Sequence, residues 1–516
     1  MTGTVEETAA TPTPEEPAAE TAPRKRWWDL WFLLCCLVPL VVYPLNGFNA
    51  ALTRDLGVYS YGGQQFADGV APYVAIMNRA GPLAHLIPGI AAWVARQVGV
   101  DDLLGMRVLM MLISAACVGI AYLLGRDLYR SRMAGVATAA ALLSIEGFAI
   151  YATDGPREKT SLVLFVLLAS LAIVHQRWFA TGFFIALATL TWQPVFFAVA
   201  AGAAVAALVG QRTGRLKALV AIAVGGIVPT LVTVGGYAAI GKLQVFLDDF
   251  LIINAEYTRQ TSLFDNGSAI WSFMVDAYGW SLWVLLGGMV VQFVLAVAVW
   301  RSPARRTPLG AAQVGFGVVF IVGLLWSLKA FNGFPDAFFL LPESIIGIGG
   351  IVAVLAKRLP GRVVLAVTVA WAVAVTALAV NWSLTNRDDG LVQQRADVKA
   401  IMGMLPSDAT MVTVEAPQPL VLAHKRNLSV YQLFGNGLID YVEATWPGGI
   451  AGYARWIQAK SPTVITVGDD GPPDWLRPVL GGYSRVGNSG KWAWYLNRDL
   501  GDPTLQQARD VLHDRG

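Results

Sequence analysis

The stretch "LTRDLGVYSYGGQQFADGVAPYVAIMNRAGPL", residues 52–83, follows the first long apolar run of the chain and brings ionisable side chains close to it. Asp55 lies near its start and Arg79 near its end. An ionised side chain at the centre of a bilayer costs about 2.5–3.5 kcal/mol on insertion scales, so such residues belong at a membrane edge or in a wet cavity. We therefore expect this stretch to form a polar loop at a membrane surface.

The composition indicates a polytopic membrane protein. Hydrophobic residues make up 55% of the 516 residues and charged residues 14%, whereas soluble domains carry about 25% charged residues. The net charge of +3 does not point to a nucleic-acid partner. Cys35, Cys36 and Cys117 lie in apolar runs, so we expect no disulfide framework. Neither they nor the four histidines have the spacing of a zinc site.

The amino terminus is rich in Thr, Pro, Glu and Ala, so we predict that residues 1–26 are disordered. They lack the basic and then apolar order of a signal peptide. The basic stretch "RKRWW" directly precedes the first apolar run. By the positive-inside rule, the amino terminus therefore lies in the cytosol.

Apolar runs of roughly 17–25 residues mark candidate membrane spans, and the sequence predicts eleven. With the amino terminus inside, every basic cluster between spans falls on the cytosolic side. We interpret residues 81–98 as a helix lying in or partly entering the outer face, because counting it as a span breaks this charge pattern. The predicted spans are 27–46, 104–125, 133–152, 160–176, 178–193, 194–210, 217–240, 275–300, 309–328, 337–356 and 362–382.

From residue 383 onward helices alternate with short strands. We predict strands in "ATMVTVEA" (409–416), "PTVITVGD" (462–469) and "KWAWYLN" (491–497). No span follows them. The expected architecture is therefore a helical membrane module, residues 27–382, followed by a small α/β domain outside the membrane, residues 383–516.

In this topology the carboxylates gather on the external side, in loops 47–103, 153–159, 241–274 and 329–336. The cytosolic gaps are basic and contain almost no carboxylates. This asymmetry indicates an outward-opening polar cavity above an apolar bundle. A carboxylate acts as a general base on a hydroxyl, and arginine binds phosphate through two parallel hydrogen bonds. Such a rim suits an amphiphilic substrate with a phosphate at the membrane surface.

The segment "RDLGVYSYGGQQFADGVAPYVAIMNRAGPLAHLIPGIAAW" resembles the first external loop of the C-type (GT-C) glycosyltransferases that use polyprenyl-phosphate sugars. These include the protein O-mannosyltransferases and the lipid A aminoarabinose transferases. In that superfamily an acidic residue after the first span is the proposed base, and it falls on Asp55. The pieces "GVAPY" and "NRAGPL" match later parts of the same loop. The resemblance covers about residues 27–500.

The segment "YATDGPREKTSLVLF" occupies the position of the second acidic motif of these enzymes. It offers both Asp154 and Glu158, and the resemblance does not decide between them. Each also has a plain structural interpretation. Asp154 fits an ordinary turn, and Glu158 fits an ion pair with Arg157 or Lys159 on a solvated rim.

Other positions depart from the family pattern. Arg79 replaces the usual lysine of the first loop and keeps its positive charge, although it also fits a snorkelling interfacial arginine. In "LATLTWQPVFF" Trp192 replaces a lysine, and in "FNGFPDAFFLLP" Asp336 replaces a histidine. Asp336 could pair simply with Lys329, seven residues before it.

The resemblance implies an inverting glycosyltransferase at the outer face of the plasma membrane, which moves a sugar from a polyprenyl-phosphate donor to a hydroxyl acceptor. Asp55 is the expected base, unless it only caps a helix beginning near Leu56. Asp154 or Glu158 is the expected second acid. The expected ligands of the donor phosphate are Arg79, Lys159 and Lys329.

No ligand cluster in the sequence requires a metal, but a single divalent ion between Asp55 and the second acid stays open. The sugar and the acceptor, whether protein, lipid or polysaccharide, are not specified. Two alternatives belong to other classes: a transporter of lipids or lipid-linked sugars, and a non-catalytic subunit of an envelope-assembly complex. Transporters usually carry ionisable groups near the midplane or on both sides, whereas these concentrate on one rim.

Overall fold

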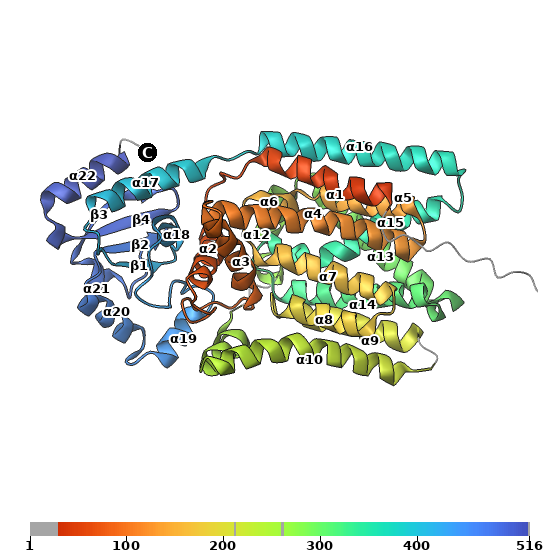
Figure 1. Cartoon of the computed structure of the whole chain (residues 1–516), viewed down its shortest axis with the longest axis horizontal. Coiled ribbons are helices and arrows are strands. Elements are labelled where there is room, and N and C mark those ends of the chain that lie inside the picture. Colours follow the sequence, from red (N-terminus) through yellow and green to blue (C-terminus); the bar gives the residue numbers. More distant parts are fainter. Residues whose placement is uncertain (1–28, 211–212, 260–262, 514–516) are drawn as a thin grey trace, which may run out of the picture.

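The structure is a computed structural model and describes residues 29–210, 213–259 and 263–513. The N-terminal segment predicted to be disordered, residues 1–26, lies outside these ranges. Figure 1 shows a bundle of long helices and, at one end of it, a unit that contains a β-sheet. Two short helices, α2 and α3, lie between the bundle and this unit.

Every predicted span coincides with a helix or with a bent pair of helices. The helices of the bundle are α1 (Leu30–Val42), α4 (Asp102–Tyr129), α5 (Arg132–Leu143), α6 (Glu146–Thr153), α7 (Glu158–Val174), α8 (Trp178–Thr189), α9 (Val195–Gly210), α10 (Arg215–Ala239), α13 (Ser281–Trp300), α14 (Pro308–Lys329), α15 (Leu341–Leu355) and α16 (Gly361–Thr385). The pair α5 and α6 shares one predicted span and is bent by 67°.

Length and composition make this a helical membrane protein. Within the described residues, six helical segments are long and apolar enough to cross a membrane, and the bent pair α5–α6 raises the number to seven. Three further apolar helices are shorter, at Leu30–Asn46, Trp178–Thr189 and Val195–Gly210. The number of eleven spans stays a prediction.

The first predicted external loop contains two helices, α2 (Arg54–Ala67) and α3 (Leu83–Gln97), and the second of them matches the helix expected at 81–98. The two helices pack closely at Gly62, where the absence of a side chain leaves room for His85: a Cβ atom at this position would lie 2.0 Å from Nδ1 of His85. Thr53 is the N-cap of α2, and its hydroxyl accepts a hydrogen bond from the backbone N–H of Leu56. The interpretation of Asp55 as the cap is therefore wrong, since Asp55 lies in the first turn.

Shorter elements connect the long helices. They are η1 (Tyr43–Asn46), α11 (Leu243–Leu247), the π-helix η2 (Asp248–Tyr257), α12 (Leu263–Tyr278), η3 (Pro303–Arg306) and η4 (Phe334–Leu340). The last of these brings Asp336 down among buried neighbours.

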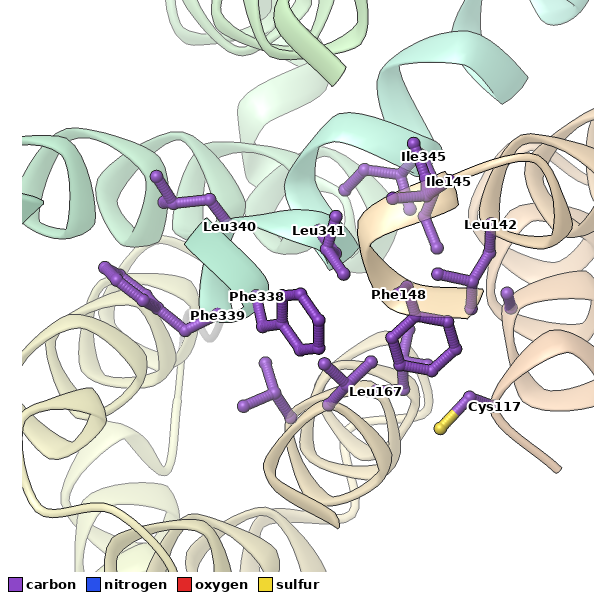
Figure 2. Close-up of a cluster of buried hydrophobic side chains, with 14 of the residues drawn as sticks. Cys117, Leu142, Ile145, Phe148, Leu167, Phe338, Phe339, Leu340, Leu341 and Ile345 are labelled. Carbon is purple, nitrogen blue, oxygen red and sulfur yellow. The ribbon is translucent and has the colours of Figure 1, made fainter. Parts of the chain in front are cut away.

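The apolar centre of the bundle lies where α4, α6, α7 and η4 meet (Figure 2). Phe148 of α6 and Phe338 of η4 are both fully buried, and their ring centroids are 5.6 Å apart. Figure 2 shows Leu167 and Leu341 beside these rings. This core fixes η4 and the start of α7 relative to each other, and both elements carry charged residues at the same end.

We call residues 390–513 the C-terminal unit. Its strands are β1 (Met411–Val414), β2 (Val464–Gly468), β3 (Tyr483–Ser489) and β4 (Trp492–Asn497), in the order β1-β2-β4-β3. Strands β1 and β2 are parallel, and the other neighbours are antiparallel. The remaining elements are α17 (Gly390–Met404), α18 (Gln418–Ala423), α19 (Leu438–Thr445), α20 (Gly449–Lys460), α21 (Arg477–Leu480), η5 (Arg498–Leu500) and α22 (Asp502–His513).

Helices cover both faces of this sheet. Successive strand residues point to opposite sides, so alternate residues of one strand belong to different cores. Met411 and Val464 belong to a core shared with α17 and α22, whereas Val412 and Ile465 face α20. The first of these cores also contains Leu56 of α2. The C-terminal unit and α2 therefore share one continuous apolar core.

Candidate active site

A cavity of about 340 Å³ lies where α2, the start of α7, the segment before η4 and the C-terminal unit meet. We call it the charged cavity. Its lining combines charged side chains with aromatic ones, among them Tyr59, Tyr151 and Trp192. The charged lining residues are Arg54, Asp55, Arg79, Arg157, Glu158, Lys159 and Asp336.

Asp55 is held by two arginines. Its Oδ2 accepts a hydrogen bond of 2.6 Å from Nη1 of Arg157, and its Oδ1 accepts one of 3.2 Å from Nε of Arg54. Burial acts to raise the pKa of Asp55, but the two guanidinium groups outweigh this effect and hold the pKa well below its usual range. Asp55 is therefore a carboxylate at neutral pH. Because 42% of its side chain is exposed, it can meet a ligand in the charged cavity.

Glu158 lies deeper and contacts cations on both sides. Its Oε2 is 3.2 Å from Nε of Arg157 and its Oε1 is 3.6 Å from Nζ of Lys159. Only 3% of its side chain is exposed. Glu158 is therefore placed to orient Arg157 and Lys159 rather than to meet a bulky ligand.

Lys159 forms an ion pair with Asp336. Asp336 also accepts a hydrogen bond of 2.6 Å from the backbone N–H of Asn332. The expected pair between Lys329 and Asp336 is therefore wrong, because the partner of Asp336 comes from the start of α7. The Lys159 ammonium group lies 4.9 Å from the centroid of the Trp192 ring, in a cation–π contact. A cation thus stands next to the tryptophan that replaces the family's lysine.

Arg79 also lines the charged cavity, and in the described part of the chain its guanidinium forms no ion pair. Its backbone is held firmly, since its carbonyl oxygen accepts hydrogen bonds from Gln193 Nε2 at 3.0 Å and Asn254 Nδ2 at 2.9 Å. Burial lowers the pKa of Arg79, an effect that Tyr59 and Asp55 oppose. With its backbone fixed in this way and no ion pair among the described residues, Arg79 can offer its guanidinium to an anion.

A buried arginine joins the two segments that carry these side chains. Arg107 of α4 donates hydrogen bonds to the carbonyl oxygens of Phe48 at 2.5 Å, Ala50 at 2.8 Å and Gly155 at 3.3 Å. It thereby fixes the approach to α2 against the segment before α7.

The C-terminal unit supplies one wall of the charged cavity through Leu433 and Asn436. Glu415, after β1, holds this wall in place because its Oε1 accepts hydrogen bonds from the backbone N–H groups of Phe434 and Gly435, at 2.5 and 2.8 Å. Its Oε2 is 3.0 Å from Nη1 of Arg54. Glu415 therefore connects the wall to the arginine that contacts Asp55.

The remaining predicted site residues lie elsewhere. Asp154 accepts a hydrogen bond of 3.2 Å from Nδ2 of Asn46 and is not part of the lining. Burial raises the pKa of Asp154 to about 7, although Arg107 acts in the opposite direction. Lys329, at the end of α14, is also not part of the lining. Within the described ranges, no group of three or more His, Cys, Asp or Glu residues could hold a metal ion.

Sequence comparison finds no matching family model and no matching curated protein. Comparison with solved structures, in contrast, finds strong similarity. ArnT from Cupriavidus metallidurans bound to undecaprenyl phosphate matches with a TM-score of 0.66 at 15% identity, over 92% of this chain and 99% of ArnT. The chain has the GT-C fold.

Two further structures agree with this fold. ArnT in the apo state matches with a TM-score of 0.64 at 14% identity, over 92% of this chain and 99% of ArnT. The oligosaccharyltransferase of Archaeoglobus fulgidus, tethered to an acceptor peptide, matches with a TM-score of 0.52 at 12% identity, over 92% of this chain and 74% of that protein. The predicted GT-C-like architecture is thereby confirmed at the level of the fold.

Two contacts of the charged cavity are not predicted from the sequence. The sequence suggests Arg157 only as a partner of Glu158, whereas Arg157 also binds Asp55. No motif points to Glu415. Neither contact leaves a local signal, because the partners are 102 residues apart for Asp55 and Arg157 and 361 residues apart for Arg54 and Glu415.

Proposed function

We propose that this GT-C chain is an inverting glycosyltransferase of the plasma membrane that transfers a sugar from a polyprenyl-phosphate donor to a hydroxyl acceptor. One observation carries the proposal: the partly exposed carboxylate of Asp55 lines the same cavity as the guanidinium of Arg79, which forms no ion pair with any residue that the structure describes. A base for the acceptor and a cation for the leaving phosphate are the two groups this transfer needs. The undecaprenyl phosphate bound by ArnT, which shares the fold, supports a lipid-phosphate donor.

In the proposed reaction, the acceptor oxygen forms a bond to the anomeric carbon while the bond between that carbon and the phosphate oxygen breaks. The electron pair of the broken bond leaves with the polyprenyl phosphate, and the hydroxyl proton passes to Asp55. Because the acceptor oxygen becomes more acidic as its new bond forms, a carboxylate of low pKa accepts this proton late in the step. A single displacement of this kind inverts the anomeric configuration.

The leaving phosphate is assigned to Arg79, with Lys159 as a second cation. Lys159 is charge-paired with Asp336, so it stabilises the added negative charge less than Arg79 does. We propose Glu158 rather than Asp154 as the second acid, because only Glu158 lines the cavity. Its role is to orient Arg157 and Lys159.

The proposed orientation places the charged cavity and the C-terminal unit on the external side of the plasma membrane. The wall formed by Leu433 and Asn436 then contributes to the choice of acceptor. A metal ion is not part of the proposed step.

The decisive experiment measures the release of undecaprenyl phosphate from a panel of undecaprenyl-phosphate monosaccharides by the purified full chain. We expect one donor to be turned over, and Asp55→Asn to abolish turnover while the variant still folds. Asp440→Asn is the matched control, because Asp440 has the same 42% side-chain exposure and pairs with Arg259 at 2.7 Å. Transfer by Asp55→Asn at the wild-type rate would exclude Asp55 as the base. Flipping of intact donor without cleavage would make the chain a transporter.

A further inference from the structure

A second cavity lies at the end of the bundle away from the C-terminal unit, among α4, α7, α8 and α14 (Figure 1). It has a volume of about 670 Å³, roughly twice that of the charged cavity. We call it the basic cavity, because Arg126, Arg130, Arg177 and His175 line its rim. The proposed transfer does not use any of these residues.

Only part of this positive charge is neutralised. Asp127 pairs with Arg126 at 2.7 Å and with His175 at 3.0 Å. For Arg130 and Arg177, by contrast, the described part of the chain shows no ion pair, and both side chains are exposed. The rim therefore offers two guanidinium groups to an anion. Arginine is the side chain best suited to hold a phosphate through parallel hydrogen bonds.

The inner walls of the basic cavity are apolar. Leu168 and Leu171 of α7 lie on one side, Phe184 of α8 and Leu123 of α4 on others. A purely polar anion would gain nothing from these walls, whereas a hydrocarbon chain would bury its surface against them. The positive charge at the rim is complementary to an anionic lipid headgroup, and the apolar inner walls are complementary to its acyl chain.

We propose that the basic cavity binds one phospholipid with an anionic phosphate headgroup, held by Arg130 and Arg177 at the rim with an acyl chain along α7 and α8. The site lies at the opposite end of the bundle from the charged cavity, so this lipid is distinct from the proposed donor. Its binding would tie together the ends of four helices.

Basic residues are expected at a cytosolic membrane face in any case, and the chain contains an internal control for this effect. Lys357 and Arg358 lie between α15 and α16, are exposed and are predicted to be cytosolic, but they do not line the basic cavity. If charge alone attracted lipids, the pair Lys357 and Arg358 would bind an anionic lipid as tightly as the pair Arg130 and Arg177. The proposal requires that only Arg130 and Arg177 bind the lipid.

The test is native mass spectrometry of the purified full chain titrated with dioleoyl phosphatidylglycerol. We expect one tightly retained lipid whose Kd rises at least fivefold in the double variant Arg130→Gln/Arg177→Gln. The matched double variant Lys357→Gln/Arg358→Gln removes two charges from the same face and should leave that Kd unchanged. Because neither Arg130 nor Arg177 has an ion partner in the described chain, the first double variant should also keep the wild-type unfolding temperature.

Three comparison ligands separate the sources of binding. Dioleoyl phosphatidylcholine, which has no net charge, should bind more weakly than phosphatidylglycerol. Inorganic phosphate at the same concentration should not displace the lipid, and dihexanoyl phosphatidylglycerol should bind more weakly because its chains are short. Equal binding of the two dioleoyl lipids, displacement by inorganic phosphate, equal retention of the long- and short-chain lipids, or an equal loss in both double variants would overturn the proposal.

Discussion

Arg157 lies between two carboxylates, Asp55 and Glu158, and only 10% of its side chain is exposed. A buried cation in contact with a carboxylate favours its ionised form, and together with Arg54 it holds the pKa of Asp55 well below its usual range. Acidification to about pH 5 therefore leaves Asp55, the proposed base, in its carboxylate form, since even an unperturbed aspartate has a pKa of about 3.9. We do not expect Asp55 to limit activity in mildly acidic solution.

Asp154 has the opposite electrostatic behaviour, because burial raises its pKa to about 7. The folded protein therefore binds its proton more tightly than the unfolded chain does, and this contribution to stability is lost as the pH rises from about 4 to 7. Asp154→Asn mimics the protonated form and can still accept the hydrogen bond from Asn46. We expect the unfolding temperature of the variant, relative to wild type, to be higher at pH 8 than at pH 4.5. A difference that does not change with pH would contradict this assignment.

A substitution at Arg79 should change donor binding without changing the stability of the fold. Arg79→Gln removes a charge that has no ion partner in the described structure but faces the proposed donor phosphate. A hydrogen bond to a charged group contributes about 1.5–3 kcal/mol, so we expect the KM for the donor to rise about tenfold to hundredfold. Steady-state kinetics with varied donor measures this change. The unfolding temperature should stay at the wild-type value, and a large drop would show that Arg79 serves the fold instead.

At the scale of elements, the turn after β1 connects the C-terminal unit to the charged cavity through Glu415. Glu415 adopts a left-handed backbone conformation, with φ of 58°, which is uncommon for residues other than glycine. Its side chain holds both the cavity wall at Phe434 and Gly435 and the guanidinium of Arg54. The conformation at Glu415 therefore affects the surroundings of Asp55 both through the cavity wall and through Arg54.

We expect Glu415→Gln to lower transfer about tenfold, because small displacements of groups in a reaction site are costly. The effect should appear in the KM for the acceptor, since the wall at Leu433 and Asn436 is displaced. Glu443→Gln is the matched control: Glu443 accepts a hydrogen bond of 2.7 Å from the backbone N–H of Ile450 in the same unit, and it does not line the charged cavity. Equal losses in both variants would indicate a general effect on folding.

The helices are predictable because long apolar runs between basic clusters leave few alternatives. The apolar run at α3 indicates a helix, and the charge pattern keeps it from being counted as a span. The strand β3 was not predicted. Its sequence "YSRVGNS" has no apolar alternation, and the register shifts between Arg485 and Gly487. Such a strand is determined by pairing with β4 and by packing of α22, neither of which is visible in a local window.

The candidate site was predictable in part. Of the site residues predicted from the sequence, Asp55, Arg79, Glu158 and Lys159 line the charged cavity, whereas Asp154 and Lys329 do not. Pairings were not predictable, as Asp336 shows: a lysine seven residues away suggested one partner, whereas η4 and α7 bring it to another that is 177 residues away. Ion pairs depend on how elements pack, and sequence distance carries little information about that.

At the scale of the whole molecule, the charged cavity and the basic cavity lie at opposite ends of the bundle (Figure 1). The proposed orientation makes a direct prediction. A cysteine introduced by Asp470→Cys in the C-terminal unit should react with a membrane-impermeant maleimide in intact cells. Arg358→Cys, between α15 and α16, should react only after permeabilisation. The reverse pattern would place the charged cavity in the cytosol and refute the external donor site.

The apolar core that joins α2 to the C-terminal unit limits how an acceptor arrives. Leu56 is 1% exposed in that core, and separating the two parts would bring it and its neighbours into contact with water, at about 25 cal/mol for each Å² of apolar surface. We therefore expect the C-terminal unit to stay docked on α2 rather than to swing clear as a hinged lid. If the proposed transfer is correct, the acceptor hydroxyl has to reach the charged cavity while this core stays closed, and we expect slender flexible acceptors to be used in preference to folded protein surfaces.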